Sequence, residues 1–426
     1  MTYSEIKDSG VPWIGEIPAH WEITRSKIVF QNVTIKNHPD AMVLSLYRDL
    51  GVLPKESRDD NHNVTSEDTA QYKFVEPGNL VINKMKAWQG SLAVSAYSGI
   101  VSPAYYVCKF RSNAVDKRYV HYLLRSSVYA QEFERLSTGM RVGQWDLGID
   151  DFLKIPILLP ETDEQKSIAD FLDAQCGEID AIIGEAKASI EEYKRWKASV
   201  IYQAVTKGLD PDSPMKDSGV KGMGIIPAHW KLAPLKYVSV LDPSCQNACF
   251  SDDDEVSFAP MECIRTDKRI PKTAPKFRDN GTYSKFNDGD IAIAKVTPCF
   301  ENGNICIMDG LVNGYAFGSS ELFNVRAKAI QTRFLFYYMQ SSCFINGAVA
   351  TMTGVAGLKR VSSYYMRNAR APIPPNDEQS EIVAYLDKQC STIDAVVYEK
   401  ESLISELEAY KKSLIYEAVT GKRKVG

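Results

Sequence analysis

The sequence predicts an α+β protein in which two mixed α/β domains are joined by two long helices forming an antiparallel coiled coil. Three observations support this fold class. The stretch 163–206 recurs as 377–420, a shorter lead-in at the start of the chain also recurs, and the segments between them follow one order twice. Repetition along the whole chain indicates a pseudo-two-fold internal repeat, with two structurally equivalent halves.

The long repeat predicts one helix in each half of the chain. The two copies align at an offset of 214 without a gap, and 21 of their 44 positions are identical. Thr162 and Asn376 are the expected N-cap residues, and the glutamines three positions later, Gln165 and Gln379, complete a capping-box pattern. Neither copy contains proline, and at 1.5 Å per residue each helix is roughly 65 Å long.

Both predicted helices carry apolar residues at alternating spacings of four and three. This heptad pattern is typical of a coiled-coil seam. A single helix of this kind is more often a plain structural rod, but two such seams in one chain most simply pack on each other. The expected seam residues are Leu172, Cys176, Ile179, Ile183, Ala186, Ile190, Tyr193 and Val200 in the first helix, and Leu386, Cys390, Ile393, Val397, Ile404, Leu407 and Leu414 in the second.

A short lead-in precedes each half of the chain and contains glycine, proline and tryptophan. Residues 7–21 and 216–230 share most of their residues at an offset of 209, including Ile-Pro-Ala-His-Trp at the end. The density of glycine and proline predicts turns and not helix. His20 and His229 are candidates for catalysis, but each lies beside proline and tryptophan. We expect both segments, called here the first and second clasp, to dock against the rest of the protein.

Between clasp and helix, each half contains a globular segment with one common plan. A turn leads into a buried strand, a second strand follows, and then come an aromatic-rich helix and a polar loop with glycine. These segments are 74–82, 102–110, 118–134 and 137–145 in the first globule and 286–293, 319–325, 333–341 and 353–360 in the second. The expected domains are 1–155 and 211–372, each a clasp followed by a globule, and 156–210 and 373–426, each a long helix.

Composition and charge indicate a cytoplasmic protein whose globules are more basic than its helices. The net charge of the chain is −4. Residues 161–210 carry 6 Lys and Arg against 11 Asp and Glu, whereas residues 231–370 carry 17 against 13. No signal peptide is evident, and no apolar run approaches the ~20 residues of a membrane-spanning helix. The nine cysteines lack a zinc-site spacing, since Cys245 and Cys249 have no second pair.

The sequence contains no pattern that predicts catalysis by this chain. It lacks the Gly-x-x-x-x-Gly-Lys-Ser/Thr phosphate loop, the Asn/Asp-Pro-Pro-aromatic sequence of adenine methylases, and a glycine-rich cofactor loop after a strand. The acidic run 252–255 fits a solvated loop better than a metal site. We therefore expect a non-catalytic protein with no metal and no cofactor of its own.

The order clasp, globule, helix, clasp, globule, helix resembles the specificity (S) subunit of type I restriction–modification systems. The resemblance rests on the clasps ending at Trp21 and Trp230, the helix starts at 160–165 and 375–379, and the helix ends at 202–206 and 416–420. It implies that each globule is a target-recognition domain reading one half of a split double-stranded DNA sequence, and that the helices are a spacer. It also implies two methyltransferase (M) subunits that use S-adenosylmethionine to methylate adenine, and motor-nuclease (R) subunits that use ATP and Mg²⁺.

On this interpretation, the DNA contacts are expected in the globules. Lys and Arg suit phosphates, and Arg, Lys, Asn and Gln can reach base edges in the major groove. The candidates follow the first buried strand of each globule or lie in its polar loop. They are Lys84, Lys86, Trp88, Gln89, Arg141 and Gln144 in the first globule and Lys295, Thr297, Lys359 and Arg360 in the second.

Two alternatives stay open at this point. The chain could be the recognition subunit of a related system whose partner fuses methylase and nuclease, which the neighbouring genes would reveal. It could instead be a coiled-coil scaffold with no DNA role, which the absence of any sequence-selective DNA binding would indicate.

Overall fold

The computed structural model describes residues 3–48, 50–57, 69–141, 144–244, 255–265, 268–269, 273–274, 282–355 and 357–425. For residues 140, 141, 144, 268, 269, 273, 274 and 355 it describes the backbone alone. Cys245, Cys249 and most of the acidic run at 252–255 lie outside the described residues.

The chain forms two compact units. Unit 1 consists of Met1–Ala186 and Glu401–Gly426, and unit 2 consists of Lys187–Lys400. Each unit therefore contains one clasp, one globule and one half of each long helix. This division differs from the four consecutive segments expected from the sequence, because antiparallel helices bring the beginning of one helix beside the end of the other.

The two predicted long helices are confirmed as α5 (Thr162–Lys207) and α10 (Asn376–Val419). In unit 1 the Lys411 ammonium of α10 lies 2.6 Å from Asp180 of α5, and in unit 2 the Lys197 ammonium of α5 lies 2.8 Å from Asp394 of α10. These two ion pairs occupy equivalent positions of the repeat, because Asp180 aligns with Asp394 and Lys197 aligns with Lys411. Both pairs join helices that run in opposite directions.

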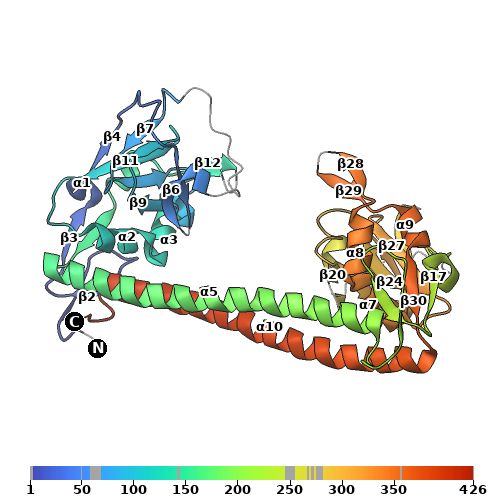
Figure 1. Cartoon of the computed structure of the whole chain (residues 1–426). Helices are drawn as coiled ribbons and strands as arrows, with labels where there is room; N and C mark the ends of the chain where they lie inside the picture. The colour runs from blue at the N-terminus through green and yellow to red at the C-terminus, as the bar shows by residue number, and fades with distance from the viewer. Residues whose placement is uncertain are drawn as a thin grey trace. The chain divides into compact units, whose positions relative to one another are not determined.

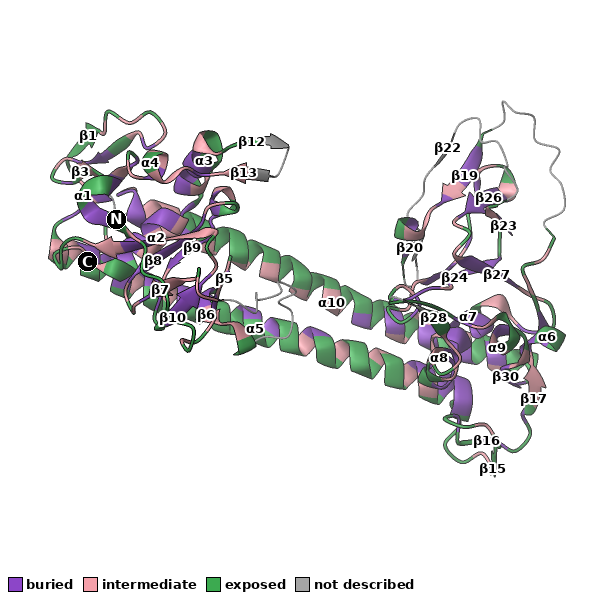
Figure 2. Ribbon diagram, turned by 90° about the horizontal axis from the view of Figure 1, so that it is seen from above, coloured by how far each residue is buried: buried purple, intermediate pink, exposed green. Residues whose placement is uncertain are grey.

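Burial along the helices follows the heptad pattern (Figure 2). Ten of the predicted seam residues are buried: Leu172, Cys176, Ile179, Ile183, Ala186, Ile190, Leu386, Cys390, Ile393 and Leu414. Val397, Ile404 and Leu407 of α10 and Tyr193 and Val200 of α5 are half-buried. A continuous apolar face on each helix is what coiled-coil packing requires.

The capping-box interpretation of Gln165 and Gln379 is wrong. The Gln165 side chain accepts a hydrogen bond from the Asp116 backbone N–H (2.9 Å) and donates one to the Pro160 carbonyl (2.8 Å). Gln379 does the same with Gln331 N–H (2.8 Å) and the Pro374 carbonyl (2.9 Å). Both amides are buried, so they satisfy the backbone of the adjoining globule and not that of their own helix.

The globule of unit 1 is built around an antiparallel sheet with strand order β4-β11-β8-β9 (Figure 1). Strand β14, which leads into α5, pairs with β3. The predicted helix at 118–134 is broken at Ser126, whose extended backbone ends α2 and begins α3. The predicted polar loop forms the hairpin β12–β13. The strands are β3 (Glu22–Arg25), β4 (Phe30–Val33), β5 (Leu44–Tyr47), β6 (Gly51–Pro54), β7 (Lys73–Val75), β8 (Leu80–Asn83), β9 (Leu92–Val94), β10 (Gly99–Val101), β11 (Tyr105–Phe110), β12 (Thr138–Arg141), β13 (Gln144–Asp146) and β14 (Pro156–Leu159), and the helices are α1 (Ser26–Val29), α2 (Lys117–Arg125), α3 (Ser127–Leu136) and α4 (Ile149–Phe152), with short 3₁₀ turns at Lys55–Ser57 and Ala87–Gln89.

The globule of unit 2 repeats this arrangement with the sheet β18-β27-β24-β25 and adds a second sheet, β22-β19-β26-β23. Strand β30 leads into α10 and pairs with β17, and the polar loop again forms a hairpin, β28–β29. The strands are β17 (Lys231–Pro234), β18 (Ser239–Leu241), β19 (Val256–Ala259), β20 (Ile264–Arg265), β21 (Lys268–Arg269), β22 (Thr273–Ala274), β23 (Ser284–Asn287), β24 (Ile291–Ala294), β25 (Ile305–Ile307), β26 (Tyr315–Gly318), β27 (Leu322–Ala327), β28 (Thr353–Val355), β29 (Leu358–Arg360) and β30 (Arg370–Ile373), and the helices are α6 (Leu235–Val238), α7 (Thr332–Gln340), α8 (Ser342–Val349) and α9 (Ser363–Asn368), with 3₁₀ turns at Met261–Cys263 and Val312–Gly314.

Each clasp is a short hairpin that holds the start of one long helix and the end of the other. The hairpins are β1 (Ile6–Asp8) with β2 (Glu16–Pro18), and β15 (Met215–Asp217) with β16 (Ile225–Pro227). In unit 2, His229 and the indole N–H of Trp230 both contact Glu378 at the start of α10, at 2.7 and 2.8 Å. Gly208, which follows α5, has a φ of 73°, and a Cβ there would lie 3.2 Å from Trp230.

The first clasp makes the equivalent contacts within unit 1. His20 lies 2.8 Å from Glu164 at the start of α5, and the Tyr3 hydroxyl donates to the other oxygen of that carboxylate at 2.6 Å. A Cβ at Gly421, after α10, would lie 3.4 Å from the buried side chain of Trp21. Both clasp histidines therefore pair with helix-start carboxylates, in agreement with the docking interpretation.

Candidate nucleic-acid interface

In unit 1 the structure brings together the two groups of predicted DNA contacts. The loop after β8 contains Lys84 to Gln89, and the hairpin β12–β13 lies against it. The Leu147 N–H donates to the Lys84 carbonyl at 3.0 Å, and the Lys84 ammonium lies 3.0 Å from the Asp146 carboxylate. The rings of Trp88 and Trp145 meet edge to face, with centroids 5.3 Å apart. Backbone, charge and aromatic contacts thus fix the hairpin to the loop.

The predicted DNA-contact residues of unit 1 differ in their exposure to solvent. Lys86 and Gln89 are exposed, Lys84 and Trp88 are half-buried, and the Trp88 indole donates to the Met85 carbonyl at 3.1 Å. Arg141 ends β12 and Gln144 begins β13, but their side chains lie outside the described residues. Contacts of all six residues with DNA stay predictions.

In unit 2 the equivalent loop and hairpin also meet, through a buried hydroxyl. The Thr297 hydroxyl donates to the Gly357 carbonyl (2.8 Å) and accepts from the Lys359 N–H (3.0 Å). The Val361 N–H donates to the Lys295 carbonyl at 2.9 Å, which matches the bond between Leu147 and Lys84 in unit 1. Thr297 therefore holds the hairpin in place, and the DNA contact predicted for it stays a prediction.

Two of the predicted cations in unit 2 have intramolecular partners. The Arg360 guanidinium donates to both oxygens of Glu321, from Nε at 3.0 Å and from Nη2 at 2.7 Å. These hydrogen bonds lower the pKa of Glu321 and raise the pKa of Arg360. Lys295 donates to the Ser320 carbonyl at 3.1 Å and lies over the Phe323 ring at 4.7 Å. The Lys359 side chain is exposed.

A basic and aromatic cluster in unit 1 was missed by the sequence reasoning. Burial lowers the pKa of Lys73, and the nearby ammonium groups of Lys36 and Lys84 lower it further. Lys73 also lies over the Tyr106 ring at 5.4 Å, and Lys36 donates to the Gln71 side chain at 2.8 Å. Lys73 is half-buried and also donates to the Tyr105 carbonyl, and a lysine beside an aromatic ring is a candidate contact for a nucleic-acid backbone. The three lysines are far apart in sequence, so no local pattern could have revealed the cluster.

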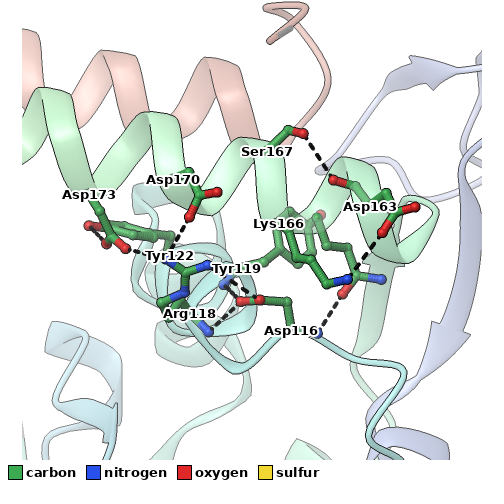
Figure 3. A network of polar contacts seen from close by, with 10 residues as sticks. Asp116, Arg118, Tyr119, Tyr122, Asp163, Lys166, Ser167, Asp170 and Asp173 are labelled. Atoms are coloured by element: carbon green, nitrogen blue, oxygen red, sulfur yellow. Dashed lines mark hydrogen bonds and ion pairs between the residues drawn. The ribbon is translucent and has the colours of Figure 1, made fainter.

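A second missed feature attaches the unit 1 globule to α5 (Figure 3). Arg118 of α2 donates to Asp173 of α5 at 2.8 Å and also contacts Asp170 at 2.8 Å. The Tyr122 hydroxyl donates to the other oxygen of Asp173 at 2.8 Å, and this hydrogen bond adds to burial in raising the pKa of Tyr122. We call Arg118, Tyr122 and Asp173 the first clamp.

The same clamp recurs in unit 2 with fewer carboxylates. Arg333 of α7 donates from Nε to Asp387 of α10 at 3.1 Å, and the Tyr337 hydroxyl donates to the same oxygen at 2.6 Å. Asp173 and Asp387 are identical positions of the long repeat, which was the sequence signal for this pair. We call Arg333, Tyr337 and Asp387 the second clamp.

Comparison with known proteins assigns a family to this duplicated architecture. The family model described as "Type I restriction modification DNA specificity domain" matches residues 32–192 and 262–405. The two matches together span well over half of the chain, with one match in each half. The chain belongs to this family.

Two relatives of this type I specificity family illustrate the range of similarity. The type I restriction enzyme EcoEI specificity subunit of Escherichia coli is 33% identical over 195 residues, which covers 44% of this chain and 32% of that protein. The chain thus matches about one third of the length of that relative, and the same share of the EcoAI specificity subunit. The putative MjaX specificity subunit of Methanocaldococcus jannaschii is 23% identical over 97% of this chain and 96% of its own length.

A solved structure shares the fold of this family member over nearly its full length. It comes from work on complex assembly and conformational transition of the type I R-M system, and its chain matches with a TM-score of 0.67 and 13% identity. The match covers 95% of this chain and 98% of that one. The predicted fold class, with its repeated globules and long helices, is therefore confirmed.

The described residues provide neither a helix that could span a membrane nor a group of metal ligands. In that part of the chain, no helix is both apolar enough and long enough to cross a membrane. Nor do the described His, Cys, Asp and Glu residues gather in any group of three or more that could hold a metal ion.

Proposed function

We propose that this chain is the DNA sequence-recognition subunit of a type I restriction–modification complex. In this proposal each globule binds one half of a split double-stranded DNA target, and the chain scaffolds two adenine-methyltransferase subunits. Motor-nuclease subunits join in the full complex. The observation that carries the proposal is the membership of a DNA specificity family together with two globules that share one arrangement of sheet, helices and hairpin.

The contrast between globules supports two different half-sites. Both units place a hairpin against the loop after the central strand, through equivalent backbone hydrogen bonds. The side chains on these hairpins differ, since Asp146 of unit 1 aligns with Arg360 of unit 2. A shared backbone fixes where a base would be read, and unlike side chains select unlike bases there.

Exposed apolar side chains on the helices support binding of two partner subunits. Trp196 of α5 and its repeat equivalent Tyr410 of α10 are 50% and 49% exposed. Ile182 of α5 and Leu403 of α10 are also exposed and lie at heptad spacing from Trp196 and Tyr410 respectively. A large exposed aromatic residue at the same position of both repeats is suited to two copies of one partner, because aromatic side chains dominate interface energetics.

Coexpression with a type I methyltransferase subunit from the same organism tests the proposal. We expect a complex with two methyltransferase subunits, and adenine methylation at one split DNA sequence that disappears when this chain is omitted. Trp196→Ser with Tyr410→Ser should weaken assembly by about 30-fold or more, the effect of losing a contact of about 2 kcal/mol. Tyr364→Ser is the matched control, since Tyr364 is 77% exposed but lies on α9 in a globule.

Two outcomes would favour the alternatives. Assembly with no sequence-selective DNA binding or methylation would indicate a coiled-coil scaffold. A neighbouring gene that fuses methylase and nuclease would indicate the related class of system.

A further inference from the structure

At one equivalent position of the two hairpins, the side chain is positively charged in unit 2 and negatively charged in unit 1. Arg360 in β29 and Asp146 in β13 are equivalent at the repeat offset of 214, and each is followed by a residue whose N–H bonds to the loop after the central strand. The backbone at this position is therefore held in the same way in both units. The side chains can differ in function without a change of scaffold.

The contacts of Arg360 leave one edge of its guanidinium available. Glu321 accepts from Nε (3.0 Å) and Nη2 (2.7 Å), which occupies one of the two edges that can form paired hydrogen bonds. The other edge carries the two N–H groups of Nη1 and the second N–H of Nη2. Among the described residues, none accepts a hydrogen bond from Nη1, and the side chain is 55% exposed.

Both members of the pair are fixed to the scaffold. The Glu321 carbonyl accepts from the Lys295 N–H at 2.8 Å, and the Glu321 N–H donates to the Ser319 hydroxyl at 3.2 Å. The buried Thr297 hydroxyl holds the hairpin that carries Arg360. A guanidinium held in its plane by a supported carboxylate loses little conformational freedom when its second edge binds a planar partner.

We propose that Arg360 reads a guanine in the half-site of the second globule and that Glu321 is its positioning residue. This proposal rests on the proposed function of DNA recognition. Two parallel N–H groups match the O6 and N7 acceptors that guanine presents in the major groove. Adenine and cytosine each place an amino donor in the major groove, and thymine offers one acceptor, so none of them matches a pair of donors.

In the first globule the equivalent position carries a negatively charged side chain, that of Asp146. The carboxylate of Asp146 can only accept hydrogen bonds, and it pairs with Lys84 at 3.0 Å. A carboxylate cannot bind the two acceptors of guanine. The guanine that Arg360 reads therefore occurs only in the half-site bound by the second globule.

The test maps methylated adenines in cells that express the methyltransferase with the wild-type chain or a variant. Arg360→Lys keeps the positive charge but loses the paired donors, so the preference for guanine at one position of one half-site should fall about 5- to 150-fold. Glu321→Gln should relax the same position by a smaller factor. Lys359→Ala is the matched control, because Lys359 is exposed in the same strand; it should lower methylation at all sites alike.

The outcomes separate this proposal from the proposed function. A wild-type chain that directs no methylated sequence overturns the proposed function itself. A defined wild-type sequence that Arg360→Lys leaves unchanged overturns the guanine assignment alone. The assignment also fails if Arg360→Lys lowers methylation equally at every site, the behaviour of a phosphate contact. Relaxation at the same position by Glu321→Gln, with an unchanged melting temperature, supports the positioning role.

Discussion

Replacement of Asp387 by alanine should destabilise the contact between α7 and α10 more than the same change at Asp173 destabilises the contact between α2 and α5. Asp387 is the acceptor for both Arg333 and Tyr337. Among the described residues, Arg333 forms no ion pair with a second carboxylate. In the first clamp, Arg118 also contacts Asp170 at 2.8 Å, so this arginine keeps a partner when Asp173 is removed.

The magnitude follows from burial. Tyr337 is 2% exposed, so its hydroxyl would lose its acceptor in a buried site, at a cost of about 1–3 kcal/mol. The Arg333 and Asp387 side chains are 50% and 38% exposed, and a pair of this kind contributes about 0.2–1 kcal/mol. Asp387→Ala should therefore cost about 1–4 kcal/mol. Asp173→Ala should cost about 1 kcal/mol, because Tyr122 is only half-buried and water can reach it.

Amide hydrogen exchange in the full chain measures the local free energy of opening. A loss of about 1–4 kcal/mol corresponds to an acceleration of roughly 5- to 800-fold in the protected amides of α7. Tyr337→Phe is the control: it should cost less alone, and it should add little in the Asp387→Ala background because the two groups share one hydrogen bond. Equal effects of the two aspartate substitutions, or unchanged exchange in α7, would refute the reasoning.

Three further predictions concern acid stability, the helices and the duplication. Burial lowers the pKa of His121 to about 3, so this imidazole stays neutral in the folded state, whereas it binds a proton below pH 6.5 in the unfolded state. The free energy of unfolding of unit 1 should therefore fall by about 1.4 kcal/mol per pH unit between pH 6.5 and 3. In acid unfolding curves, His121→Gln should flatten this dependence on pH. Ile183→Pro should break α5 at a cost of roughly 3 kcal/mol or more and reduce methyltransferase binding in pull-down assays, whereas a full-strength complex would contradict the role of the helices. A fragment of residues 1–215 should dimerise and direct methylation of an inverted repeat. In such a dimer, Asp180 of one copy can pair with Lys197 of the other copy, as Asp180 pairs with Lys411 in the full chain. A monomer by light scattering, or an asymmetric methylated site, would show that the halves are not interchangeable.

The sequence alone determined the repeated architecture and the long helices. Identity at a constant offset revealed two equivalent halves, and the heptad spacing of residues such as Leu172 and Leu386 predicted which helix face would be buried. These features could be predicted because periodicity and repetition are local properties of the chain. The buried strands and the aromatic-rich helices were located for the same reason, although the break at Ser126 was not foreseen.

Only the tertiary structure decided what the polar side chains do. Gln165 has the spacing of a capping box, but its amide bonds to the backbone at Asp116, 49 residues earlier. Glu321 became a candidate positioning residue only because the fold places it against Arg360, 39 residues later. Apolar burial depends on a spacing that the sequence displays, whereas a hydrogen bond depends on two groups that the fold brings to within about 3 Å. No local pattern encodes that distance.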